Sequence, residues 1–118
     1  MRKTVLVADD YPDSAALLCQ LIEMKGDYET VAASDGRDAL ARLSERHIDI
    51  AILDVEMPVL GGVETAQRMR ESLGDARPLL IAVTGRAYLA EVTKSGLFDH
   101  VFEKPVAPAE LLRVLDGV

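Results

Sequence analysis

Polar residues that could carry chemistry follow the apolar runs of this chain at four points. Asp9 and Asp10 follow the first run, and Asp54 follows the third. Thr84 follows the fourth, and Lys104 comes shortly after the fifth. Three carboxylates held together repel one another unless a cation neutralises them, and Mg²⁺ suits them because it takes hard oxygen ligands. A carboxylate beside such an ion can attack a phosphoryl group and become an acyl phosphate, while an ammonium group and a hydroxyl hold the phosphoryl oxygens. The set therefore indicates an aspartyl-phosphate site.

Each of these residues also has an ordinary structural interpretation. Asp9 and Asp10 alone would be assigned as a helix-capping pair. Asp54 could be a loop acid, Thr84 part of a turn, and Lys104 the solvated end of a strand. Their placement favours a shared site, because ligands of open parallel sheets bind beyond the carboxyl ends of the strands.

The elements that must position these residues alternate along the chain. Short apolar runs rich in β-branched residues predict strands that are buried on both faces of a parallel sheet. These runs are Val5–Ala8, Tyr28–Ala33, Ile48–Leu53, Leu79–Val83 and Val101–Phe102.

Helical patterns lie between and after the apolar runs. Apolar residues recur at i, i+3, i+4 and i+7 from Ala15, from Gly36 and from Pro108, and more sparsely from Ala66. The weakest helical pattern covers about Arg86 to Ser95. Turn residues separate the elements, and Asp13 and Asp35 are candidate N-caps. Five strands alternating with five helices predict an α/β fold, a three-layer sandwich around a parallel sheet.

Composition limits the classes of protein that the chain can belong to. Its 118 residues suit one domain, 1–118, and 49% hydrophobic residues suffice for a core without staples. The net charge of −7 disfavours direct contact with nucleic acid or an anionic membrane. The first apolar run is too short for a signal peptide or a membrane span. The single cysteine, Cys19, is expected to be a small buried hydrophobic residue, and a chain with one cysteine fits a reducing compartment. A cytoplasmic location without membrane insertion is therefore expected.

The ordered set of motifs resembles the response regulator receiver family. The resemblance extends from about Thr4 to Leu115 and is carried by four motifs. These are the paired acids Asp9-Asp10, the segment Asp54-Val55-Glu56-Met57-Pro58 with Gly61-Gly62 behind it, Thr84-Gly85, and Lys104-Pro105. No single motif is decisive, but the ordered set is highly specific.

The resemblance implies a fold, a site and partners. The fold would be flavodoxin-like, (βα)5, with parallel strand order 2-1-3-4-5. Asp54 would be the phosphoacceptor. Asp10, Asp54 and the backbone carbonyl of Glu56 would bind Mg²⁺ directly, with Asp9 helping through water. Lys104 would pair with the phosphoryl group.

Signalling properties follow from the same resemblance. Thr84 would report phosphorylation, and the Lys104–Pro105 bond would be cis. The phosphoryl group would come from the phosphohistidine of a histidine kinase or a histidine phosphotransfer protein, and the acceptor would then bind an unidentified downstream protein. Catalysis by the chain would be limited to phosphoryl transfer and autodephosphorylation. A stand-alone regulator and a fragment of a hybrid kinase both remain open.

Two features differ from the usual family pattern. An aromatic residue normally stands three positions before the lysine, and here that position holds Val101. His100 and Phe102 are out of phase with it because adjacent side chains of a strand face opposite ways. We therefore expect output through Thr84 and a loop or helix shift. The stretch from Thr84 to Lys104 is also slightly short, which predicts a trimmed fourth helix.

A further expectation concerns Glu56 and Arg86. Glu56 stands two positions after the phosphoacceptor Asp54, and Arg86 stands two positions after Thr84. In the family that the chain resembles, residues at these two positions flank the path of hydrolytic water. An ion pair between them would slow loss of the phosphoryl group by blocking water.

Two other functions compete with the signalling interpretation. An aspartyl-nucleophile phosphatase would use an acid two positions after its nucleophile, where Glu56 stands, but no cap domain is expected to enclose a substrate. A flavin or nucleotide binder would need a phosphate-binding loop after the first strand. Asp9 and Asp10 would instead repel phosphate without a metal.

Overall fold

The sheet has the strand order expected from the resemblance. In the computed structural model, which describes residues 2–117, five parallel strands are arranged β2-β1-β3-β4-β5. This confirms the flavodoxin-like order 2-1-3-4-5. The strands are β1 (Lys3–Ala8), β2 (Tyr28–Ala33), β3 (Ile50–Asp54), β4 (Leu79–Thr84) and β5 (His100–Glu103).

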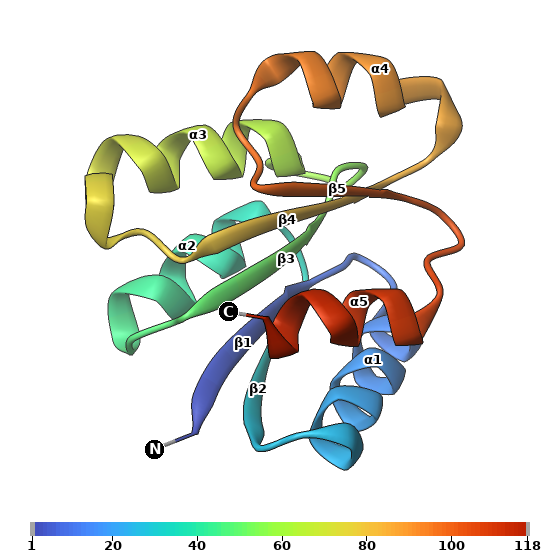
Figure 1. Ribbon diagram of the computed structural model, residues 1–118. Coiled ribbons are helices and arrows are strands. Elements are labelled where there is room, and N and C mark those ends of the chain that lie inside the picture. The colour runs from blue at the N-terminus through green and yellow to red at the C-terminus, as the bar shows by residue number, and fades with distance from the viewer. Residues whose placement is uncertain (1, 118) are drawn as a thin grey trace.

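Helices cover both faces of the sheet, as Figure 1 shows. They are α1 (Pro12–Lys25), α2 (Gly36–Glu45), α3 (Gly62–Leu73), α4 (Arg86–Ser95) and α5 (Pro108–Asp116), with a short 3₁₀ turn at Gly74–Ala76. One core packs α1 and α5 against the alternate strand residues that include Val5 and Ile52. The other packs α2 and α3 against the intervening residues, such as Leu6 and Leu53. The expected three-layer α/β sandwich is confirmed.

The two edge strands depart from the expectation that every apolar run is buried on both faces. β1, β3 and β4 are almost wholly buried, whereas β2 is buried only at its ends and β5 is half-buried or exposed. β2 and β5 lie at the two sides of the sheet, where only one neighbouring strand covers them. Apolar composition alone did not distinguish edge strands from central ones.

Three strands, β3, β4 and β5, each end one residue further along the chain than the apolar run that predicted them. β3 begins at Ile50 and includes Asp54, and β4 includes Thr84. Ile48 is buried but precedes the strand. Asp54 and Thr84 are thus the terminal residues of their strands, whereas Asp9, Asp10 and Lys104 lie in the segments that follow β1 and β5.

Helix starts agree with the sequence analysis at one site and differ at another. Asp35 is the N-cap of α2, and its side chain accepts a hydrogen bond from the backbone N–H of Asp38. Asp13 is not a cap: α1 begins at Pro12, Tyr11 occupies the N-cap position, and Asp13 lies in the first turn. Proline is favoured at the first helical position because its fixed φ suits the helix and it has no N–H to satisfy.

Two smaller expectations can be compared with the structure. The helix expected at about Arg86 to Ser95 is confirmed with those bounds, and it ends at Gly96, whose φ of 69° is left-handed. Cys19 is half-buried against the α1 and α5 core rather than fully buried. Within residues 2–117 no helix is both long and apolar enough to cross a membrane.

Candidate functional site

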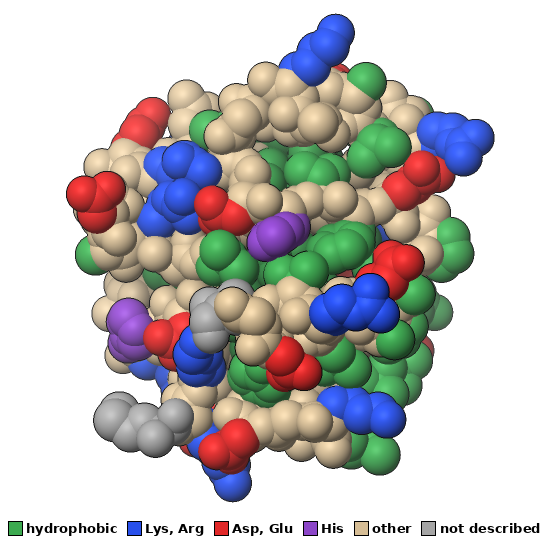
Figure 2. All heavy atoms as spheres, viewed as in Figure 1, with side chains coloured by type: hydrophobic (Ala, Val, Ile, Leu, Met, Phe, Trp, Pro, Cys, Tyr) green, Lys and Arg blue, Asp and Glu red, His purple; other side chains and the backbone are tan. Residues whose placement is uncertain are grey.

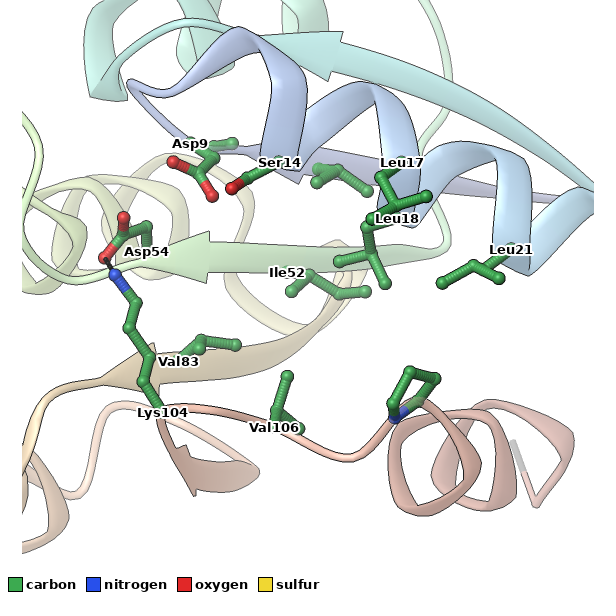
Figure 3. Close-up of a pocket in the computed structure, with 13 residues that line it drawn as sticks. Asp9, Ser14, Leu17, Leu18, Leu21, Ile52, Asp54, Val83, Lys104 and Val106 are labelled. Carbon is green, nitrogen blue, oxygen red and sulfur yellow. Dashed lines mark ion pairs between the residues drawn. The ribbon is translucent and has the colours of Figure 1, made fainter.

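Asp54 is a buried carboxylate whose contacts come from two distant parts of the chain. Its side chain is 5% exposed at the end of β3. Oδ1 pairs with the Lys104 ammonium at 3.0 Å and accepts a hydrogen bond from the backbone N–H of Glu56 at 3.1 Å. Figure 3 shows Lys104 reaching past Val83 toward this oxygen. Oδ2 makes no hydrogen bond with residues 2–117 and so keeps its lone pairs available.

Asp9 and Asp10 complete an acidic cluster around Asp54. One carboxylate oxygen from each of the three residues lies within 4.8 Å of the others. Asp9 accepts a hydrogen bond from the N–H of Tyr11 at 2.9 Å, which orients its carboxylate, whereas Asp10 is exposed. The structure thus brings together the three acids that the sequence analysis assigned to one site.

The electrostatics of this cluster favour a cation. Burial raises the pKa of Asp9, and the negative charges of Asp54 and Asp10 raise it further, outweighing the opposing Tyr11 N–H and Lys104. A carboxyl with a raised pKa lies where its negative charge is poorly compensated. Closely spaced carboxylate oxygens are the donor set that Mg²⁺ prefers. The residues present therefore fit a divalent cation.

Lys104 is held in its charged form by the same acids. Burial would lower its pKa, but the hydrogen bond to Asp54 and the charges of Asp54, Asp9 and Glu56 outweigh burial and raise it. The ammonium group therefore stays protonated at neutral pH. A fixed positive charge next to a buried carboxylate can also neutralise the oxygens of a group that is transferred to it.

Thr84 lies beside Lys104 through the backbone. The Lys104 N–H donates to the Thr84 carbonyl at 2.8 Å, and the Lys104–Pro105 peptide bond is cis, as expected. Thr84 is fully buried, and its hydroxyl donates to the Gly85 carbonyl at 3.2 Å. Thr84 ends β4 one residue after Val83, which pairs in register with Asp54, so the Thr84 backbone lies next to the end of β3.

The expected ion pair between Glu56 and Arg86 is wrong for this structure. Arg86 pairs with Glu103, with 3.1 Å between Nε and Oε2. Sequence position alone did not identify Glu103 as the partner of Arg86, because the proximity of the two residues arises from β-sheet register. Glu103 stands opposite Thr84 in the pairing of β4 with β5, and α4 begins two residues after Thr84.

Val101 occupies the strand position that the aromatic residue normally takes. It pairs in register with Ala82, so it shares a face of the sheet with Thr84. Phe102 packs on the opposite face, against the α1 and α5 core. The expectation that Phe102 is out of phase is confirmed.

Gly62 has a spatial role that its motif did not reveal. A Cβ at Gly62 would lie 2.6 Å from the carbonyl oxygen of Asp54, closer than real contacts allow. The first turn of α3 therefore packs directly on the backbone of the phosphoacceptor candidate. A paired glycine after the acid was the only sequence signal for this close approach.

An apolar groove of about 220 Å³ leads away from the site. Leu17, Leu18 and Leu21 of α1 form one wall, and Val106 and Pro108 form the other. Asp9, Asp54 and Lys104 lie at its polar end (Figure 3). Hydrophobic side chains also gather on the visible surface over α1 and α5 (Figure 2). The sequence analysis did not anticipate this groove, because its walls come from opposite ends of the chain.

Comparison with known proteins identifies the family. Residues 5–116 match the family model described as "Response regulator receiver domain". The chain belongs to the response regulator receiver family, and it is a receiver domain of two-component signalling. This assignment does not favour the alternative of an aspartyl-nucleophile phosphatase.

Curated relatives are longer proteins with several activities. The sensor histidine kinase RcsC of Escherichia coli (strain K12) is 41% identical over 105 residues, covering 86% of this chain but 11% of that protein. The DNA-binding response regulator MtrA of Mycolicibacterium smegmatis is 31% identical over 112 residues, covering 95% of this chain and 48% of that protein. The chain thus spans between about a tenth and a half of these relatives.

Solved structures agree in fold over almost the whole chain. A CheY-like response regulator receiver domain from Methanospirillum hungatei JF-1 has a TM-score of 0.89 and 27% identity, covering 99% of this chain and 93% of that one. The response regulator TrrA of Thermotoga maritima, in complex with Mg(2+)-BeF, has a TM-score of 0.86 and 30% identity, covering 98% of this chain and 97% of that one.

Proposed function

We propose that Asp54 accepts a phosphoryl group from a phosphohistidine in a Mg²⁺-dependent reaction and that this switches binding to a downstream protein. The observation that carries the proposal is the 3.0 Å pair between Lys104 and the buried Asp54 carboxylate, next to the cluster that Asp54 forms with Asp9 and Asp10. Residues 1–118 would act as one receiver domain, although residues 1 and 118 lie outside the described part of the chain.

In the transfer step, Oδ2 of Asp54 attacks phosphorus because Oδ1 already accepts two hydrogen bonds. A new O–P bond forms as the N–P bond to the donor imidazole breaks, and the imidazole nitrogen keeps the electron pair of that bond. The product is an acyl phosphate. Lys104 and the Thr84 hydroxyl hold the phosphoryl oxygens. In autodephosphorylation a water oxygen bonds to phosphorus as the O–P bond to Asp54 breaks. Asp54 keeps the electron pair of that bond as a carboxylate, and inorganic phosphate leaves with the proton of the water.

Mg²⁺, when bound, neutralises the developing charge on the phosphoryl oxygens. Asp10, Asp54 and the backbone carbonyl of Glu56 would hold the ion directly, and Asp9 would hold it through water. The backbone of Glu56 is suited to this because its N–H already bonds to Asp54 Oδ1, which keeps the segment close to the carboxylate.

The donor would be a histidine kinase or a histidine phosphotransfer protein. The apolar groove beside the acids supports a protein donor, because a small phosphodonor would not need a leucine-lined surface. The net charge of −7 supports a protein target over nucleic acid. The single cysteine and the short first apolar run support a cytoplasmic location.

The test uses the full chain with Mg²⁺ and acetyl phosphate, followed by intact mass spectrometry. We expect one added phosphoryl group in the wild type and none in Asp54→Asn. Asp75→Asn is the matched control, because it removes an exposed acid remote from the cluster and should be labelled normally. Labelling that persists in Asp54→Asn, or that does not require Mg²⁺, would contradict the proposal.

A further inference from the structure

The ion pair between Arg86 and Glu103 joins the same two strand ends that carry Thr84 and Lys104. Arg86 is the first residue of α4, and Glu103 is the last residue of β5. Their side chains meet at 3.1 Å. The pair therefore links the start of α4 to β5 directly beside the phosphoacceptor site.

This pair is easily broken. The Arg86 side chain is 87% exposed and that of Glu103 is 34% exposed. Ion pairs in contact with water contribute little to stability, because water and salt screen both charges. Arg86 makes no other hydrogen bond or ion pair within residues 2–117. It can therefore change partners at little cost when a stronger anion becomes available nearby.

A second carboxylate, that of Glu56, lies close to the backbone at the start of α4. The Glu56 carboxylate lies over Gly85, with Oε2 3.3 Å from the position that a Cβ at Gly85 would take. Among the described residues Glu56 makes no ion pair, although its charge helps to raise the pKa of Lys104. Arg86 follows Gly85 directly, so its backbone lies beside this carboxylate.

Phosphorylation would change the balance between these acids. A phosphoryl group adds about 1.5 to 2 negative charges at neutral pH, together with strong acceptor oxygens. The planar guanidinium matches phosphate geometry with two parallel hydrogen bonds, whereas Arg86 meets Glu103 through Nε alone. The new anion would thus compete with Glu103 for Arg86.

We propose that Arg86 is a phosphoryl-binding residue that Glu103 holds in reserve in the unphosphorylated protein. When Asp54 carries a phosphoryl group, Arg86 leaves Glu103 and pairs with the phosphoryl oxygens. The link between α4 and β5 is then lost, and Glu103 is released at the protein surface. Phosphorylation is read in this way without an aromatic side chain at position 101. The inference rests on the proposed role of Asp54.

The first test measures the affinity of the full chain for beryllofluoride, a phosphoryl mimic, at saturating Mg²⁺. Glu103→Gln frees Arg86 and should bind the mimic two- to five-fold more tightly than the wild type, the small change expected from an exposed pair. Arg86→Ala should bind two- to five-fold more weakly. The double variant should match Arg86→Ala, because Glu103 acts only through Arg86.

Matched controls separate this coupling from a general charge effect. Glu91→Gln and Arg37→Ala make the same charge changes at exposed positions on α4 and α2, and we expect wild-type affinity from both. The proposal is overturned if Glu103→Gln behaves like Glu91→Gln, or if it still tightens binding in the Arg86→Ala background.

The second test follows the Arg86 Nε–H signal by ¹⁵N NMR as beryllofluoride is added. The signal should move in the wild type and stay fixed in Asp54→Asn. If the signals of Asp54 and its neighbours move while Arg86 Nε does not, this inference fails and the proposed function stands. If the wild type does not respond to the mimic at all, both fail.

Discussion

The ammonium group of Lys104 reaches Asp54 across an intervening strand. Asp54 ends β3, Lys104 follows β5, and β4 lies between them in the sheet, yet Nζ and Oδ1 are 3.0 Å apart. Neighbouring strands are separated by about 4.8 Å, so a contact across two spacings needs a long side chain. The four methylene groups of lysine supply that length and place its charge at the carboxylate.

Lys104→Met should therefore remove the charge while keeping most of the length. We expect phosphorylation by acetyl phosphate to slow by roughly 10²-fold, the usual loss when one charge-stabilising donor is removed. Phosphate-affinity electrophoresis over time measures the rate. Lys94→Met, at an exposed position of α4, should keep the wild-type rate. A Lys104→Met rate within a few-fold of wild type would show that the ammonium group does not assist transfer.

Magnesium and Asp9→Asn should each stabilise the fold, because both relieve repulsion among Asp9, Asp10 and Asp54. The pKa of Asp9 is raised in the folded state, chiefly by burial, so the folded protein keeps this proton to higher pH than the unfolded chain does. The free energy of unfolding must then fall as pH rises from the ordinary pKa, 3.8, through the folded pKa. Without metal, Asp9→Asn should gain up to about 1 kcal/mol at pH 7.

Urea unfolding at pH 7 with and without Mg²⁺ measures both effects. The metal should stabilise the wild type more than it stabilises Asp9→Asn, because the variant has lost one acid of the site. Equal stabilisation of the two proteins by Mg²⁺ would place the ion elsewhere.

Tyr28 should make stability sensitive to alkaline pH. Its hydroxyl donates to Asp116 Oδ1 at 2.7 Å, tying β2 to the end of α5. Burial, reinforced by the hydrogen bond and charge of Asp116, raises the pKa of Tyr28 to about 12 from its ordinary 10.0. This stabilisation is complete below pH 10 and is lost as pH rises toward 12. Tyr28→Phe should cost about 1 kcal/mol at pH 7.

Thermal unfolding across pH 8 to 12 tests this dependence. The wild type should lose stability between pH 10 and 12 more steeply than Tyr28→Phe. Tyr88→Phe, at an exposed tyrosine of α4, should show the wild-type profile. Parallel curves for wild type and Tyr28→Phe would contradict the assigned role of the hydroxyl.

Val59 is a site where substitution should increase stability. Its φ of 66° is left-handed, its side chain is 69% exposed, and a hydrogen bond of 2.7 Å from the Leu60 N–H to the Pro58 carbonyl closes the turn around it. A γ-turn with positive φ at its central residue is strained for a residue with a Cβ, whereas glycine adopts positive φ without steric cost. We expect Val59→Gly to gain about 1 kcal/mol, measured by urea unfolding.

Val59→Ala is the informative control because it shortens the side chain but keeps the Cβ that causes the strain. It should gain little. If alanine stabilises as much as glycine, exposure of the valine side chain, and not the backbone, explains the effect.

The sequence alone determined the class of fold and grouped the candidate site residues. Alternation of apolar runs with helical patterns specifies a parallel sheet, because local periodicity reflects which face of each element is buried. Polar residues at the ends of those runs specify the site, because the carboxyl ends of parallel strands meet at one edge. Asp9, Asp10 and Asp54 could therefore be grouped before any contact between them was seen.

Only the tertiary structure decided which of these groups touch. Arg86 pairs with Glu103 and not with Glu56, because of the β4–β5 register and the position at which α4 begins. The partial exposure of β2 depends on strand order, and the groove depends on α1 and α5 packing side by side. These relations join residues far apart in the chain, and neither local propensity nor periodicity carries information about them.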